Sequence, residues 1–102
     1  MKNIRDKDVE DNTEKLCDAI DDGNTEVVEE ILSNKEVDIN GLHGLSPLIC
    51  AVNRGHFDIL RRLLEEPEIE LGRCDTDGDT ALHVACEYNR VSIVKLLCQV
   101  YP

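Results

Sequence analysis

Hydrophobic residues recur along this chain in short groups whose spacing is typical of amphipathic helices. Two of these groups lie in the middle of the sequence and consist of Leu48, Ala51 and Val52, followed by Ile59, Leu60, Leu63 and Leu64. Residues that lie three or four positions apart share one side of a helix. The pattern therefore predicts two short helices in succession, each with a hydrophobic side that another element must cover.

Residues typical of helix ends lie on both sides of the first of these helices. Ser46 is suited to cap its N-terminus, and Pro47 then occupies the first helical position. Gly55 follows the last hydrophobic residue, where a helix commonly ends with a residue of positive φ. Gly23 and Asn89 hold the corresponding positions elsewhere in the chain, and both residue types tolerate positive φ. We therefore expect three short helices to end in the same way.

The sequence repeats itself when it is displaced along its own length. A displacement of 34 residues, from Leu48 to Leu82, also matches Gly44 with Gly78, Ala51 with Ala85, Ile59 with Ile93, and Leu63 with Leu97. A displacement of 32 residues, from Leu16 to Leu48, also matches Ala19 with Ala51, Gly23 with Gly55, and Val27 with Ile59. The chain therefore consists of three similar units of two helices each, as repeat proteins do.

The repeats also divide the chain into segments. Residues 1–12 are rich in charge and lack an apolar stretch, so we expect them to form a flexible N-terminal segment. Three repeats follow it, and they cover residues 13–43, 44–77 and 78–102. The last repeat is expected to be incomplete at its C-terminal end.

The outer repeats give the same two-helix pattern as the middle one. In the first, Thr13 is the expected cap, Leu16 to Ile20 face inward, and a second helix is predicted over 25–33. In the third, Thr80 is expected to cap a helix over 81–88, and a second helix is predicted over 91–99.

Two segments of the chain resemble a known family. They read SPLICAVNRGHFDILRRLL and DTDGDTALHVACEYNRVSIVKLL, and both are similar to ankyrin repeats, with the pattern D-x-x-G-x-T-P-L-H-x-A, a turn Gly-His, and I-V-x-x-L-L. The third unit matches at Asp75, Gly78, Thr80, Leu82, His83, Ala85, Ile93, Val94 and Leu97. The second matches at Gly44, Ser46, Pro47, Leu48, Ala51, Gly55, His56, Ile59, Leu63 and Leu64. The first unit lacks the T-P-L-H residues and resembles an N-terminal capping repeat.

The resemblance implies an all-α fold, a solenoid of stacked helix-turn-helix units with β-hairpin-like connecting loops. The small side chains of Ala19, Ala51 and Ala85 would let the short helices of neighbouring repeats approach closely. One repeat cannot bury its own apolar side, and about three are needed for a stable stack. We therefore expect this array to be marginally stable.

Charge and composition exclude several classes of partner. The chain has 11 Lys and Arg residues against 22 Asp and Glu residues, which gives a net charge of -11. Binding to nucleic acid needs clustered cations, so we expect no nucleic-acid partner, and for the same reason no membrane partner. Because aromatic residues make up only 3% of the chain, we also expect an aliphatic core.

Targeting signals and cysteines bear on the compartment. The first ten residues alternate in charge, so they do not form a secretory signal, and no apolar run approaches the ~20 residues that span a bilayer. The five cysteines are an odd number, and reduced thiols fit an intracellular protein, either cytoplasmic or nuclear. We expect Cys74 to be exposed and four thiols to be buried, namely Cys17, Cys50, Cys86 and Cys98.

The motifs do not predict catalysis, a metal site or a cofactor. His83 and Cys86 form one H-x-x-C pair, but a tetrahedral metal site needs four ligands and no second pair accompanies it. The run Asp75–Asp79 has glycine at its fourth position and not its sixth, so it does not match a calcium loop. The resemblance instead implies that His83 ties the hairpin to the helix by hydrogen bonds, and that the chain is not an enzyme.

The resemblance further implies binding through the hairpin tips and the exposed side of each first helix. The residues at those positions are Asp21, Asp22, Leu42, His43, Leu45, Asn53, Arg54, Arg73, Thr76, Asp77, Asp79, Glu87 and Tyr88. Most of the charged residues among them are acidic. Tyr and Arg are frequent in the centres of binding sites.

These positions favour a non-enzymatic protein–protein interaction module, whose acidic concave face binds a basic peptide or patch in an inhibitory or adaptor role. The alternative is the substrate-targeting part of a larger enzyme, such as a ubiquitin ligase or a kinase. A third hypothesis is self-association through the last helix, where Leu96, Val100 and Tyr101 form an apolar end.

Overall fold

The computed structural model describes residues 4–41 and 46–100, with residues 4–6 described by their backbone alone. Helices account for most of this part of the chain. They are α1 (Ile4–Asp22), α2 (Thr25–Asn34), α3 (Pro47–Arg54), α4 (Phe57–Leu64), α5 (Ala81–Glu87) and α6 (Val91–Val100). The only β-type pairing in the described residues is one antiparallel bridge, between Cys74 and Thr80. The predicted all-α fold is therefore confirmed.

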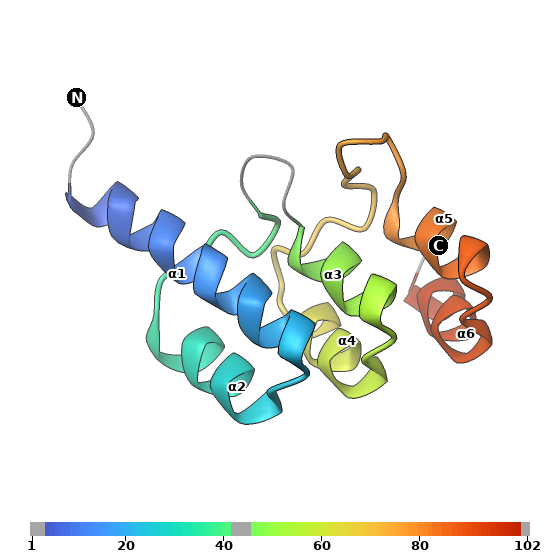
Figure 1. Ribbon diagram of the computed structural model, residues 1–102, viewed down its shortest axis with the longest axis horizontal. Coiled ribbons are helices and arrows are strands. Elements are labelled where there is room, and N and C mark those ends of the chain that lie inside the picture. The colour runs from blue at the N-terminus through green and yellow to red at the C-terminus, as the bar shows by residue number, and fades with distance from the viewer. Residues whose placement is uncertain (1–3, 42–45, 101–102) are drawn as a thin grey trace.

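The six helices form two parallel layers (Figure 1). The first helices of the three repeats, α1, α3 and α5, lie side by side, and α3 contacts both of its neighbours. Each of them also contacts the second helix of its own repeat, which is α2, α4 or α6. The molecule is therefore longer in the direction of stacking, with extents of 42 × 28 × 24 Å.

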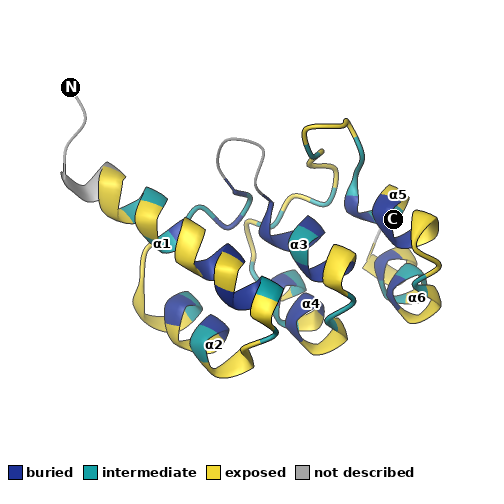
Figure 2. Cartoon of the chain, viewed as in Figure 1, coloured by how far each residue is buried: buried dark blue, intermediate teal, exposed yellow. Residues whose placement is uncertain are grey.

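The core lies between the two layers and between successive repeats, where Figure 2 shows the buried sides of the helices facing one another. Large aliphatic side chains fill it, including Leu16, Ile20, Leu60, Leu63 and Leu97, each of which is fully buried. Ala51 and Ala85 are also fully buried on α3 and α5. Their small size allows these two short helices to pack closely, as the sequence predicts.

The predicted helix ends are confirmed. Ser46 Oγ accepts a hydrogen bond from the N–H of Ile49, and Pro47 occupies the first turn of α3. Gly23, Gly55 and Asn89 follow α1, α3 and α5 with φ values of 70°, 74° and 54°. All three repeats therefore reverse direction through a left-handed residue.

The N-terminal part of the chain differs from the expectation. We expected Thr13 to be a cap, but it is buried within α1, which begins at Ile4. The predicted flexible segment 1–12 therefore lies partly in this helix, while residues 1–3 lie outside the described residues. The Thr13 hydroxyl donates to the carbonyl of Val9 at 2.7 Å and accepts from the N–H of Asp38 at 2.9 Å. Asn12 Nδ2 donates to the carbonyl of Glu36 at 3.1 Å. The bonds to Glu36 and from Asp38 attach the middle of α1 to the loop after α2.

Two of the predicted buried cysteines are exposed instead. Cys17 is 1% exposed and Cys50 is half-buried, but Cys86 and Cys98 are exposed together with Cys74. Cys86 corresponds in the repeat to Val52, which is fully buried. The difference arises because α5 packs against α3 on one side, while α5 and α6 form the last repeat of the described stack.

Candidate protein-binding surface

The described residues of the predicted binding face fall into two groups. One group lies at the C-terminal ends of α1, α3 and α5 and consists of Asp21, Asp22, Asn53, Arg54, Glu87 and Tyr88. The other lies in the connection between α4 and α5 and consists of Arg73, Thr76, Asp77 and Asp79. The two groups are separated by the length of a first helix, about 10–12 Å for seven or eight residues.

The three first helices place the residues of the first group in one row. Arg54 Nε lies 3.3 Å from Asp21 Oδ1, so α3 and α1 are joined by an ion pair across the repeats. The two side chains are 56% and 39% exposed, and such a pair adds little to stability. Asp22, Asn53 and Glu87 are exposed beside them.

Tyr88 supplies the aromatic surface of this row. It forms the C-cap of α5, where its N–H donates to the carbonyl of Val84, and its side chain is 53% exposed. An exposed tyrosine on a backbone that is fixed in this way is a suitable anchor for a partner, because little conformational entropy is lost on binding.

The second group lies on a tight turn that one aspartate organises. Asp75 Oδ1 accepts hydrogen bonds from the N–H groups of Asp77 and Asp79, each at 2.9 Å. The Asp75 N–H donates to the carbonyl of Asp79, and Gly78, with φ of 84°, donates to the carbonyl of Asp75. The backbone of the turn is thereby fixed, and the side chains of Thr76 and Asp77 project into solvent while Asp79 is half-buried.

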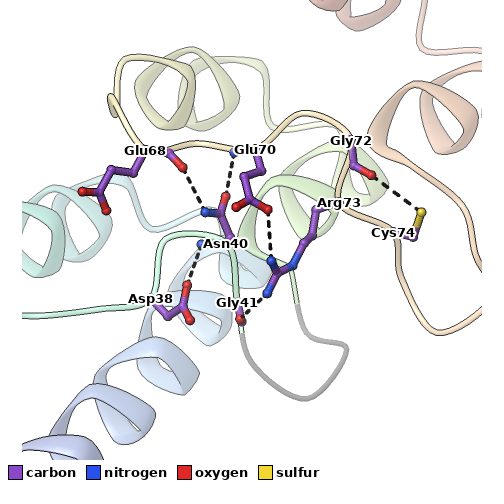
Figure 3. A network of polar contacts seen from close by, with 8 residues as sticks. All are labelled: Asp38, Asn40, Gly41, Glu68, Glu70, Gly72, Arg73 and Cys74. Carbon is purple, nitrogen blue, oxygen red and sulfur yellow. Dashed lines mark hydrogen bonds and ion pairs between the residues drawn. The ribbon is translucent and has the colours of Figure 1, made fainter.

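A polar network joins the connections of the first two repeats (Figure 3). Asn40 Nδ2 donates to the carbonyl of Glu68 at 2.9 Å, and Asn40 Oδ1 accepts from the N–H of Glu70 at 2.7 Å. Arg73, on the same side, donates to Glu70 Oε2 at 3.0 Å and to the carbonyl of Gly41 at 3.5 Å. The amide of Asn40 thus pairs with a neighbouring backbone segment in the way that a strand would.

The sequence did not single out Asn40. The available signal was an amide side chain, which carries both a donor and an acceptor, between the hydrophobic residue Ile39 and Gly41. The network also changes the interpretation of Arg73. Two of its nitrogens are engaged within the chain, so it supports the surface more than it extends from it.

Three predicted binding residues, Leu42, His43 and Leu45, lie outside the described residues. For self-association, Leu96 is half-buried and Val100 is 41% exposed, while Tyr101 lies outside the described residues. Self-association therefore stays a prediction.

His83 has the structural role that the resemblance implied. Its Nδ1 accepts from the N–H of Thr80 at 3.2 Å, while the Thr80 hydroxyl accepts from the N–H of His83. This reciprocal pair fixes the start of α5 directly after the bridge between Cys74 and Thr80.

Among the described residues, three or more potential metal ligands do not come together at any point. The described helices also lack one long and apolar enough to cross a bilayer.

Comparison with known proteins places these observations in a family context. A family model described as "Ankyrin repeats (3 copies)" matches residues 16–101. The chain is 41% identical over 70 residues, 66% of its length, to alpha-latrotoxin-Lt1a of Latrodectus tredecimguttatus. It is 29% identical over 66 residues, 65% of its length, to NAD-dependent deacetylase sir2B of Dictyostelium discoideum. It is 38% identical over 61 residues, 59% of its length, to inversin of Mus musculus.

These relatives are much longer proteins. The matched region covers 5% of the latrotoxin, 8% of the deacetylase and 6% of inversin. Ankyrin repeats are generally protein–protein interaction modules and are typically not catalytic. The similarity therefore concerns the repeats and not the activity of any whole relative.

Proposed function

This chain belongs to the ankyrin-repeat family, and we propose that it binds another protein through an acidic face. The face consists of the row at the ends of α1, α3 and α5 together with the turn at 75–79. The observation that carries the proposal is the exposed Tyr88, which lies next to Glu87 on a backbone position fixed by hydrogen bonds.

The charge of this face favours a basic segment as its partner. The pair of Asp21 and Arg54 neutralises itself, which leaves the carboxylates of Asp22, Glu87 and Asp77 exposed. A surplus of exposed carboxylates attracts a cationic partner over several ångströms, and salt screens that attraction. The partner is therefore a basic peptide or patch, and the chain acts as an inhibitory or adaptor module without catalysis of its own.

Affinity capture from cell extract tests this proposal. The variant combines Tyr88→Ala with Glu87→Lys, and the matched control is Glu30→Lys, the same charge reversal at an exposed position of α2. Circular dichroism establishes that both variants fold. We expect the double variant to lose the partner and the control to keep it, with a yield for the native chain that falls as salt rises. Equal capture by all three proteins would refute the face, and a salt-independent yield would refute the electrostatic argument.

One of the comparisons favours a second candidate function. The chain resembles a small part of a protein named as a deacetylase, and it covers 8% of that protein. The alternative is therefore a targeting segment that brings a substrate to a larger enzyme. If the polypeptide isolated from its native source also contains a catalytic domain, this alternative replaces the adaptor role. The cytoplasmic or nuclear location stays a prediction.

A further inference from the structure

A second surface of the molecule has the opposite charge character to the acidic face. It is a hollow of about 400 Å³ at the turns between α3 and α4 and between α5 and α6, and its lining includes Gly55, Phe57, Arg90 and Val91. The turns follow the first helices, so the hollow lies at the opposite end of α3 and α5 from the connections that precede those helices. We call this surface the turn hollow.

Two exposed side chains form the apolar part of the turn hollow. Phe57 is 37% exposed and Val91 is 55% exposed, and both are large hydrophobic residues at the first position of their helices. Helices α4 and α6 belong to successive repeats, so the repeat itself brings the two residues together. Exposed hydrophobic residues that converge on one hollow indicate a binding site more strongly than isolated ones do.

Arg90 supplies a positive charge in the same hollow. Its guanidinium lies over Gly55, close enough that a Cβ on that glycine would be 2.7 Å from Nη1, and its Nη2 donates to the carbonyl of Asn53 at 2.9 Å. Its Nε is buried without a hydrogen-bond partner. Arg54, Arg62 and Arg73 each lie within ion-pair distance of a carboxylate. Within the described part of the chain, Arg90 does not form such a pair.

The start of α6 adds to the positive potential. The first N–H that bonds within this helix is that of Val94, which donates to the carbonyl of Arg90. The residues before it, Val91, Ser92 and Ile93, line the hollow, and their N–H groups come before the first bond within the helix. Asn24, Ser46 and Thr80 cap other helices with side-chain oxygens, but a guanidinium cannot accept a hydrogen bond. A carboxylate from outside would complement both the N–H groups and Arg90.

We propose that the turn hollow binds a linear peptide in which an aspartate or glutamate is flanked by aliphatic side chains. The side-chain carboxylate lies at Arg90 and the start of α6, and the flanking side chains cover Phe57 and Val91. Charge complementarity at short range selects this occupant, because Arg90 forms no ion pair within the described part of the chain, whereas Arg54, Arg62 and Arg73 do. The net charge of -11 acts against an acidic peptide only at longer range, where salt screens it. The hollow borders the acidic row, since Arg90 donates to the carbonyl of Asn53, but a defined acidic peptide tests it separately from the basic partner of the acidic face.

Solution NMR with a defined probe tests the proposal on the full chain. The probe is an acetylated and amidated pentapeptide, Gly-Leu-Asp-Leu-Gly, added to isotopically labelled protein while the amide signals of Val91, Ser92 and Ile93 are followed. Two matched peptides carry Asn or Lys in place of Asp. We expect saturable shifts with the Asp peptide and an apparent Kd about tenfold higher with the Asn peptide, since a charge-assisted hydrogen bond is lost. The Lys peptide should leave these signals unchanged.

Variants separate the two parts of the site. Arg90→Gln removes the charge and keeps a polar side chain, while Phe57→Ser and Val91→Ser remove exposed apolar surface and leave Arg90 in place. We expect each of them to weaken the Asp peptide severalfold, and Glu30→Gln, at an exposed position of α2, to leave its affinity unchanged. Equal binding of the Asp and Asn peptides, unchanged affinity in the Val91→Ser and Phe57→Ser variants, or the absence of saturable shifts at α6 would each overturn the proposal.

Discussion

Replacement of Gly55 by alanine tests how the repeats are joined at their turns. Gly55 ends α3 with φ of 74°, and a Cβ built there would lie 2.7 Å from Arg90 Nη1 and 2.8 Å from Arg90 Cζ. A non-glycine residue in the left-handed region costs about 1–2 kcal/mol. The methyl group would also displace the guanidinium from the carbonyl of Asn53, and the loss of that hydrogen bond costs about 1 kcal/mol.

The expected destabilisation by Gly55→Ala is therefore about 2–3 kcal/mol, less the roughly 0.4–1 kcal/mol by which alanine restricts the unfolded chain. Two glycines offer matched controls. Gly78 has φ of 84° but open space around it, so Gly78→Ala should show the backbone cost alone. Gly72 lacks a nearby atom and a positive φ, so Gly72→Ala should be neutral or slightly stabilising. Urea unfolding followed by circular dichroism measures all three.

A double-mutant cycle with Arg90→Ala isolates the contact. If the methyl group acts by displacing the arginine, Gly55→Ala should cost about 1 kcal/mol less in the Arg90→Ala background. The same destabilisation in both backgrounds would refute the steric argument and leave only the backbone cost. A destabilisation no larger than that of Gly78→Ala would have the same meaning.

Three further predictions concern other parts of the chain. Thr13→Val should cost about 1–3 kcal/mol in urea unfolding, because it leaves the N–H of Asp38 without its acceptor, and an unchanged midpoint would contradict this. Asn40→Ala should expose the loop after α4 to faster amide hydrogen exchange at Glu70, whereas unchanged exchange there would show that Asn40 does not hold this loop. A hydrogen bond to Cys50 and burial raise the pKa of the Cys17 thiol, while the same bond lowers the pKa of Cys50. Above about pH 8.5 the unfolded chain therefore loses both thiol protons and the folded chain keeps that of Cys17, so the free energy of unfolding should fall there. A Cys17→Ala variant should fall less steeply over the same range.

The features that the sequence predicted are those decided by neighbouring residues. Ser46, Gly55 and Thr80 end or begin helices through bonds within three or four positions, so their roles follow from residue type and spacing. The features that it missed depend on distant partners. Thr13 looks like a cap, but its hydroxyl is used by Asp38, and Asn40 acts through the backbone of Glu68 and Glu70.

The binding surface follows the same division. Its acidic character could be predicted, because the positions of the first helices and hairpins follow from the repeat. The sequence could not predict which of these charged side chains remain available to a partner, because their ion pairs depend on the register between repeats. The pairing of Asp21 with Arg54 and the engagement of Arg73 became apparent only from the structure.

The arginines that join successive repeats engage only a few carboxylates. A chain of net charge -11 therefore keeps other acidic residues available for a partner. Arg54 pairs with Asp21, Arg62 pairs with Glu29 at 2.9 Å, and Arg90 donates to the carbonyl of Asn53, each across a repeat boundary. The bond to Glu29 also raises the pKa of Arg62, so that charge is retained at any ordinary pH. These exposed or half-exposed contacts fix register more than they stabilise, because stability comes from the aliphatic core.

The remaining carboxylates repel one another, and added salt weakens that repulsion as it weakens attraction to a basic partner. Salt should therefore raise the midpoint of urea unfolding while it lowers the affinity for the partner of the acidic face. The same surplus of charge causes both effects, so they should scale together when Asp22 or Asp77 is neutralised. If neutralisation changed the affinity and left the salt dependence of unfolding as it was, the partner would depend on a specific contact and not on the surplus charge.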